Sequence, residues 1–121
     1  MEDVKIILSF VWVAVILTYL LGDVMRIYAG DFTPGEIEGK PMTQKIIFGM
    51  AILMVIPIVM VVLSLILEHP VNSVVNIIVA IFWIVFNLAG IKGYKAYDKF
   101  LLIVSMGFNV LTVWYAWTQF L

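Results

Sequence analysis

Four uncharged stretches, each long enough to cross a membrane, constrain the fold of this chain more than any other feature. They are residues 6–22, 46–67, 70–91 and 100–121. A helix rises about 1.5 Å per residue, so 22 residues span about 33 Å, slightly more than a hydrocarbon core of ~30 Å. The chain is 64% hydrophobic and 12% charged, and it could not cover that much apolar surface in water. The sequence therefore predicts an all-α bundle of four transmembrane helices with lipid as its outer solvent.

The connections predict an up-down-up-down order within a single transmembrane domain, residues 1–121. The first connection carries three glycines and two prolines between residues 23 and 43, a density that prevents a long helix. The second, residues 68–72, permits only a tight antiparallel turn. Pro57 lies in the middle of the second stretch and predicts a kink there. The predicted spans are about 4–25, 44–67, 70–91 and 99–121.

Positive charges predict how the chain is oriented. The first and third connections share one side of the membrane and hold six of the seven basic residues, which are Arg26, Lys40, Lys45, Lys92, Lys95 and Lys99. The other side holds Lys5. This asymmetry predicts that loops 26–45 and 92–99 are cytoplasmic and that both termini lie outside the cell. The first stretch is interpreted as a retained span, so we expect a multi-pass protein of the plasma membrane.

Polar residues within the spans recur at alternating spacings of three and four, which places them on one side of each helix. An amide facing hydrocarbon costs several kcal/mol, so these stripes are predicted to face inward. Depth along the spans then brings several of them together in the cytoplasmic half. We expect a ligand-binding pocket there, lined by Tyr19, Asp23, Asn87, Ser105 and Asn109.

A simpler interpretation of the same residues stays open. Serine, threonine and asparagine often join membrane helices, with each hydrogen bond contributing roughly 0.6 kcal/mol. Asp23 lies at the end of its span with Arg26 three residues on, and such a pair is an ordinary interfacial anchor. The sequence alone does not choose between a pocket and interhelical bonding.

Several kinds of chemistry are excluded or unsupported by the residues present. The chain has no cysteine and one histidine, His69, so no disulfide, thiol site or Ser-His-Asp set is available. No catalytic residue, metal site or cofactor is predicted, and an enzyme is the least supported class. The net charge of −1 gives no basic field for nucleic acid. A small proton-coupled multidrug exporter would need an acid deep in the first span, and residues 6–21 contain none.

Four short segments carry a resemblance to a known family. They are Tyr19 with Asp23-Val24, Ile56-Pro57-Ile58, Asn72 with Asn76-Ile77-Ile78, and Trp114-Tyr115-Ala116-Trp117. With these, the chain resembles an uncharacterised family of small four-helix integral membrane proteins of bacteria and archaea, defined only as a domain of unknown function. The family pattern has an acid and a basic residue where this chain has Val55 and Leu65. The resemblance implies the four-helix architecture and brings no activity with it.

Two functions from different classes remain. The first is a membrane protein that binds or transports a small or lipid-like molecule through its polar interior. The alternative is a structural or accessory membrane subunit whose polar stripes only hold helices together. We also expect a homo-oligomer, because Gly49, Gly90 and Gly107 would allow close contact between copies.

Overall fold

The fold is described from a computed structural model, which covers residues 2–37 and 39–121. These residues form four helices and a small antiparallel pair of two-residue strands. Their bounds are α1 Glu2–Tyr28, β1 Glu36–Ile37, β2 Lys40–Pro41, α2 Gln44–Ile66, α3 Val71–Gly90 and α4 Ala96–Thr118. All four helices are long and apolar enough to cross a membrane. The predicted all-α fold is confirmed.

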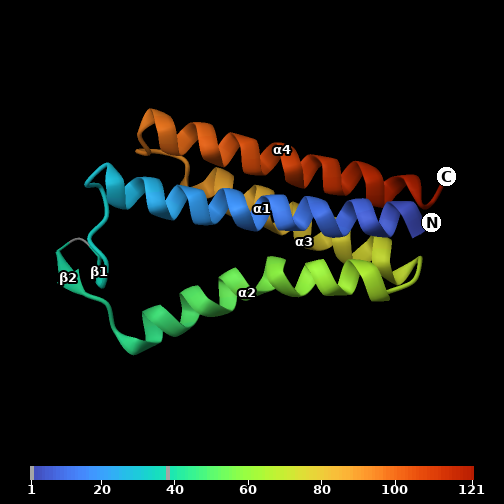
Figure 1. Cartoon of the computed structure of the whole chain (residues 1–121), viewed down its shortest axis with the longest axis horizontal. Coiled ribbons are helices and arrows are strands. Elements are labelled where there is room, and N and C mark those ends of the chain that lie inside the picture. The colour runs from blue at the N-terminus through green and yellow to red at the C-terminus, as the bar shows by residue number, and fades with distance from the viewer. Residues whose placement is uncertain (1, 38) are drawn as a thin grey trace.

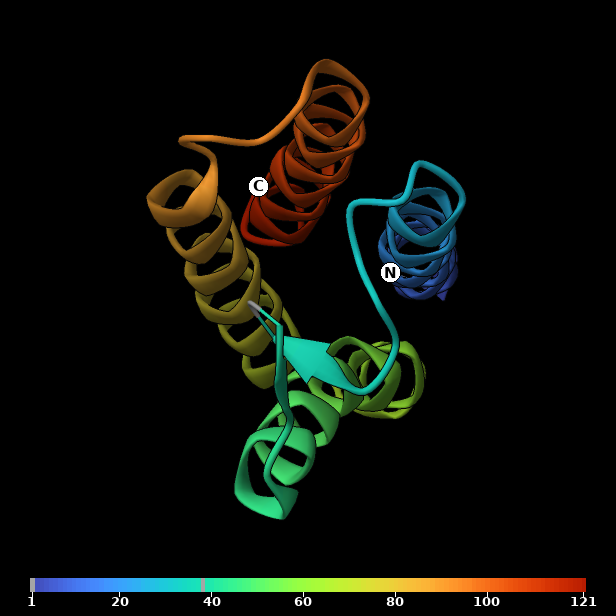
Figure 2. The ribbon, with the colours of Figure 1, turned by 90° about the vertical axis from the view of Figure 1, so that its left-hand side faces the viewer.

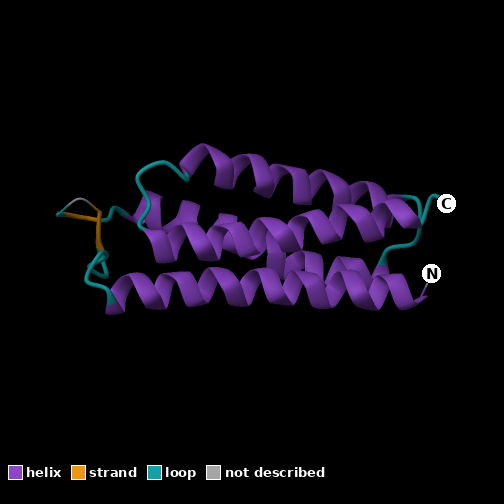
Figure 3. Cartoon of the chain, turned by 90° about the horizontal axis from the view of Figure 1, so that it is seen from above, coloured by secondary structure: helices purple, strands orange, loops and turns teal. Residues whose placement is uncertain are grey.

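The helices run up-down-up-down, so the connections gather at two opposite ends (Figure 1). We call the end with both termini and the α2–α3 turn the terminal end. The opposite end carries the strands and the α3–α4 connection, and we call it the loop end (Figure 3). Helix α1 packs against both α2 and α4, and α3 packs mainly against α4. The α1 helix is therefore the central element of the bundle.

Local chemistry explains where two of the helices begin and end. Gly30 takes a φ of 75°, a left-handed conformation that stops α1 and that side chains rarely adopt. Thr43 caps α2, since its side-chain oxygen accepts a hydrogen bond from the backbone N–H of Ile46 at 3.2 Å. Gly30 and Thr43 thus set the two ends of the segment that connects α1 to α2.

The hydrophobic core lies where all four helices meet. It consists of Trp12, Val15, Met60, Ala80 and Trp83, each at most 3% exposed. These side chains come from α1, α2 and α3, and partly buried residues of α4 such as Phe108 pack against them. The core is therefore a shared interior that joins the helices.

Only the second half of α2 belongs to that interior. Residues 44–52, which we call the α2 arm, are exposed on every side, whereas Pro57, Met60 and Ser64 are buried. Figure 2 shows the arm leaning away from the other three helices. Pro57 lacks the N–H that would bond one turn back, so the helix can change direction there. The loop half of the bundle is thus built from three helices, and the terminal half from four.

Candidate functional site

Buried polar residues near the terminal end form a network that we call the terminal seam. Its members, all at most 6% exposed, are Ser9, Trp12, Ser64, Asn72, Asn76 and Gln119. Asn76 lies at the centre: its Oδ1 accepts from Trp12 Nε1 at 2.7 Å and from Ser64 Oγ at 3.2 Å. Its Nδ2 donates to the Asn72 carbonyl at 2.9 Å.

The seam reaches all four helices. Asn72 Nδ2 donates to the Ser64 carbonyl at 2.8 Å, and Ser9 donates to the Val61 carbonyl at 2.9 Å. Gln119, directly after α4, donates to Asn72 Oδ1 at 3.2 Å. This is the bonding that joins helices in a membrane. At the terminal end, interhelical bonding is therefore a sufficient account of the polar stripes.

A second group of polar residues lies in the loop half, and we call it the loop-half cluster: Tyr19, Trp83, Asn87, Ser105 and Asn109. Asn87 Nδ2 donates to the Tyr19 hydroxyl at 2.9 Å, joining α1 to α3. The same hydroxyl lies near Ser105 and Asn109 of α4. The Trp83 ring packs 5.2 Å from the Tyr19 ring, measured between centroids. Four of the five residues predicted from depth are thus brought together.

The loop-half cluster has more unpaired polar atoms than the seam, where Gln119 Oε1 lacks a partner among the described residues. Asn109 is 0% exposed, and neither atom of its amide makes a hydrogen bond of good geometry with a described residue, although the Tyr19 hydroxyl lies beside it. Trp83 Nε1, on a side chain 3% exposed, also has no acceptor among the described residues. Leaving a buried polar group unpaired costs about 1–3 kcal/mol. Such groups call for a bound water, ion or ligand as their explanation.

Asp23, the fifth predicted site residue, lies outside this cluster. Its side chain is 56% exposed and accepts a hydrogen bond from Arg26 Nη1 at 2.6 Å. The face of α1 that meets α4 passes instead through Gly22, which is buried close to Leu101. Asp23 is the next residue and is turned about 100° away from that face. Its arrangement is that of the interfacial anchor.

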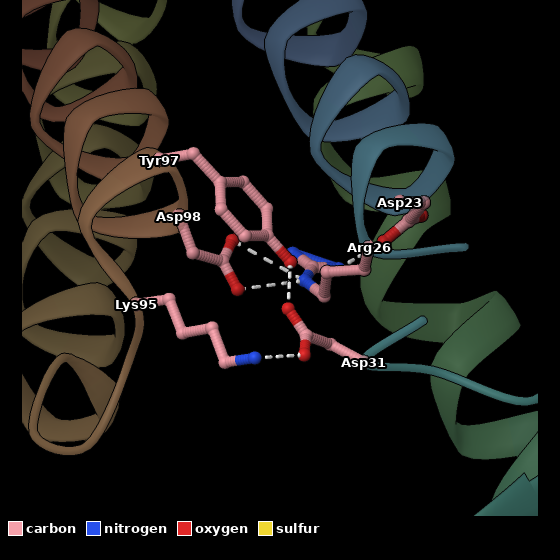
Figure 4. Close-up of polar contacts among 6 residues, drawn as sticks. All are labelled: Asp23, Arg26, Asp31, Lys95, Tyr97 and Asp98. Atoms are coloured by element: carbon pink, nitrogen blue, oxygen red, sulfur yellow. Dashed lines mark hydrogen bonds and ion pairs between the residues drawn. The ribbon is translucent and has the colours of Figure 1, made fainter. Parts of the chain in front are cut away.

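Charged residues at the loop end form a separate group, the loop-end network: Asp23, Arg26, Asp31, Lys95, Tyr97 and Asp98 (Figure 4). Arg26 Nε donates to both carboxylate oxygens of Asp98, at 3.2 and 3.0 Å, while its Nη1 bonds Asp23. Asp31 accepts from the Lys95 ammonium and from the Tyr97 hydroxyl. The network therefore ties the end of α1 and the following loop to the start of α4.

Asp98 is the residue of this network that sequence reasoning missed. Its side chain is only 9% exposed, yet it lies in a segment whose other charged residues are lysines: Lys92, Lys95 and Lys99. One signal was available, because an acid in the first turn of a helix is stabilised by the helix dipole. Its pairing with Arg26 across 72 positions required the fold.

The loop-end network also fixes the charge of Asp31. Hydrogen bonds from the Lys95 ammonium and then from the Tyr97 hydroxyl hold the pKa of Asp31 below its ordinary value. The carboxylate is therefore ionised at neutral pH, and it keeps both partners.

Comparison with known proteins places the chain in a family. The sequence model of a family of unknown function (DUF6326) matches residues 1–120. The chain belongs to this family. No curated protein and no solved structure matches it. The resemblance noted from the sequence is confirmed. Since the DUF6326 family has no assigned activity, its function must be argued from the chemistry of the residues themselves.

Two cavities of this DUF6326 protein lie in its loop half. The smaller has a volume of about 290 Å³, is lined mainly by apolar groups, and borders the loop-half cluster through Asn87. The larger has a volume of about 830 Å³ and is lined by residues of the loop-end network and of the strands. Among the residues that the structure describes, no three His, Asp or Glu side chains are placed to hold a metal ion.

Proposed function

We propose that the protein binds a small uncharged or lipid-like molecule in the loop-half cluster. The observation that carries this proposal is the fully buried amide of Asn109, whose donor and acceptor both lack a well-formed hydrogen bond to the described residues, with only the Tyr19 hydroxyl beside them. A ligand with a hydroxyl, amide or carbonyl group would satisfy both atoms and remove their desolvation penalty.

The chemistry of the cluster favours an uncharged ligand. It offers an amide, an indole N–H and hydroxyl groups, with no acid or base among its members. A buried charge needs a partner of opposite sign, because leaving it unpaired in a low dielectric is very costly. The nearest strong charges, Arg26 and Asp98, lie at the loop end and are already bonded to each other. A neutral polar group is therefore the best match.

The surroundings of the cluster favour a small or lipid-like shape. The adjoining cavity has a volume of about 290 Å³, which is at the lower end of the range for ligand sites. Phe86, Asn87 and Leu102 are among the residues that line it. The α2 arm leaves this half of the bundle, so three helices cover it instead of four. A molecule that is soluble in the bilayer can approach the cluster from the side.

The experiment is native mass spectrometry of the protein purified in a mild detergent. The wild type should carry an adduct of small mass, and Asn109→Leu should lose it. Thr112→Val is the matched control, because Thr112 is equally buried one turn along α4 and its hydroxyl bonds only to the Phe108 carbonyl of its own helix. An adduct retained by Asn109→Leu, or absent from the wild type, would refute the proposal.

The alternative function is a structural or accessory membrane subunit. The terminal seam favours it, because its bonds join all four helices and leave few polar atoms for a ligand. On this account Asn109→Leu changes detergent stability and nothing else. Purification of the protein as a free monomer would count against an accessory role and also against the homo-oligomer, which stays a prediction.

We further propose that the loop end faces the cytoplasm. Lys40, Lys45, Lys92 and Lys99 are exposed there, and basic loops remain on the cytoplasmic side. Since the chain has no cysteine, single-cysteine variants report orientation directly. In intact cells an impermeant maleimide should label Asp3→Cys and spare Thr33→Cys. The opposite pattern would reverse the orientation.

A further inference from the structure

The cavity of about 830 Å³ at the loop end has a built wall of charged and aromatic groups. It lies between the end of α1, the loop that carries the strands, and the start of α4. Its volume falls within the range of small-molecule sites. It is separate from the loop-half cluster, since the two share no residue. Its chemistry is also different, because its lining includes five ionisable side chains that carry formal charge at neutral pH: Arg26, Asp31, Glu36, Lys95 and Asp98.

Four of these five charges cancel each other. Arg26 pairs with Asp98 at 3.0 Å, and Lys95 pairs with Asp31. The fifth is Glu36, which makes no ion pair or side-chain hydrogen bond with any residue that the structure describes. The lining therefore keeps one uncompensated negative charge, and that charge lies on β1 at the wall of the cavity.

The ion pair between Asp31 and Lys95 also brings two aromatic rings to the same cavity. Phe32 follows Asp31 in the loop, and Tyr94 precedes Lys95 in the α3–α4 connection. Both residues line the cavity with Glu36, and Tyr94 also lines the smaller cavity. An aromatic face attracts a cation, and aromatic side chains with a carboxylate are the usual surroundings of a bound ammonium group.

From this placement we infer that the loop-end cavity binds a small organic cation through its ammonium group. Glu36 neutralises the positive charge, and Phe32 and Tyr94 supply the aromatic surface. The two internal ion pairs hold the walls together and do not need to open for the cation to bind. The site is independent of the proposed function, because it uses charge at the membrane surface and not neutral groups within the bundle.

The test is a titration with choline, followed by isothermal calorimetry, on the full chain in a maltoside detergent that carries no ammonium group. Choline should bind the wild type, and Glu36→Gln should weaken binding at least about tenfold. Dimethylbutanol, in which carbon replaces the quaternary nitrogen, should bind to the wild type at least about tenfold more weakly than choline does. Its affinity for the wild type and for Glu36→Gln should be the same. Asp3→Asn is the matched control, because Asp3 is an exposed acid at the terminal end. It should leave choline binding unchanged.

Three results would overturn the inference: no choline binding by the wild type, equal binding by Glu36→Gln, or equal binding of dimethylbutanol. A second arm identifies the source of the ammonium group. If phosphatidylcholine in nanodiscs competes with free choline, the ligand is a lipid headgroup; if it does not, the ligand is a soluble cation. Circular dichroism of Glu36→Gln confirms that the variant is folded, and adducts at the loop-half cluster should be the same in both proteins.

Discussion

Two asparagines that are equally buried should respond in opposite ways to the same substitution. Asn76 of the terminal seam and Asn109 of the loop-half cluster are both 0% exposed. Asn76 makes four hydrogen bonds, whereas Asn109 makes none with its side chain to the described residues. Replacing each with leucine, a side chain of comparable length, therefore removes either four interactions or two unpaired polar atoms.

The magnitudes follow from those contacts. At about 0.6 kcal/mol for each side-chain hydrogen bond inside a membrane, Asn76→Leu loses roughly 2.5 kcal/mol. It also leaves Trp12 Nε1 and Ser64 Oγ without their acceptor, and an orphaned buried donor costs about 1 kcal/mol or more. We expect a total loss of about 4–5 kcal/mol. Asn109→Leu, in protein stripped of any adduct, should stay within about 1 kcal/mol of the wild type or gain stability.

The assay is reversible unfolding by dodecyl sulfate in mixed micelles, followed by far-ultraviolet circular dichroism. Thr112→Val serves again as the control for a buried polar group bonded only within its own helix. Equal losses for the two asparagine variants would refute the distinction between a satisfied seam and an unsatisfied cluster. A larger loss for Asn109→Leu would show that its amide has a structural partner.

Three further predictions concern the α2 arm and the loop-end network. Pro57→Ala restores a backbone hydrogen bond to the Leu53 carbonyl and should straighten α2. Spin labels on Phe48→Cys and Leu88→Cys should then report a shorter distance between α2 and α3. An unchanged distance would contradict the role of Pro57 in bending α2. Asp98→Asn removes the charge that Arg26 Nε contacts and should cost about 1–2 kcal/mol in the same unfolding assay, while Asp23→Asn, on an exposed side chain, should cost less than about 0.5 kcal/mol. The folded-state pKa of Asp31 is lowered, so its contribution is full at neutral pH and is lost as the pH falls through that lowered value, below the ordinary ~4. A spin label on Thr33→Cys should therefore become more mobile in acid, and the same label in Asp31→Asn should be mobile at every pH. A label that stays immobile in acid and in Asp31→Asn would show that Asp31 does not hold this loop.

The sequence was sufficient to predict the four-helix architecture, because each of its four apolar stretches is long and uncharged. Four uncharged stretches, separated by clusters of glycine, proline and charge, leave little choice for a chain in lipid. Pro57 indicated a bend, but a single proline does not say how far the preceding half of the helix leaves its neighbours. That distance depends on packing, and residues 44–52 have no polar group that would require them to face inward.

The structure brings together four of the five residues predicted for a ligand pocket, because depth and helical periodicity act on each span separately. Tyr19, Asn87, Ser105 and Asn109 needed only a shared level in the membrane and inward-facing stripes. Asp23 shares their spacing, but the preceding Gly22 faces α4, so rotation about the helix axis determined the exposure of Asp23. Asp98 has no partner nearby in sequence, and the contact with Arg26 depends on how α1 and α4 pack together.

The terminal seam has one more consequence. Most of its amides and hydroxyls bond to one another, Gln119 Oε1 excepted, and these bonds lie between the loop half and the opposite face of the membrane. A solute that enters beside Asn87 must return the way it came unless the hydrogen bonds around Asn76 break. If the protein binds a ligand as proposed above, passage across the membrane would require these hydrogen bonds to break first.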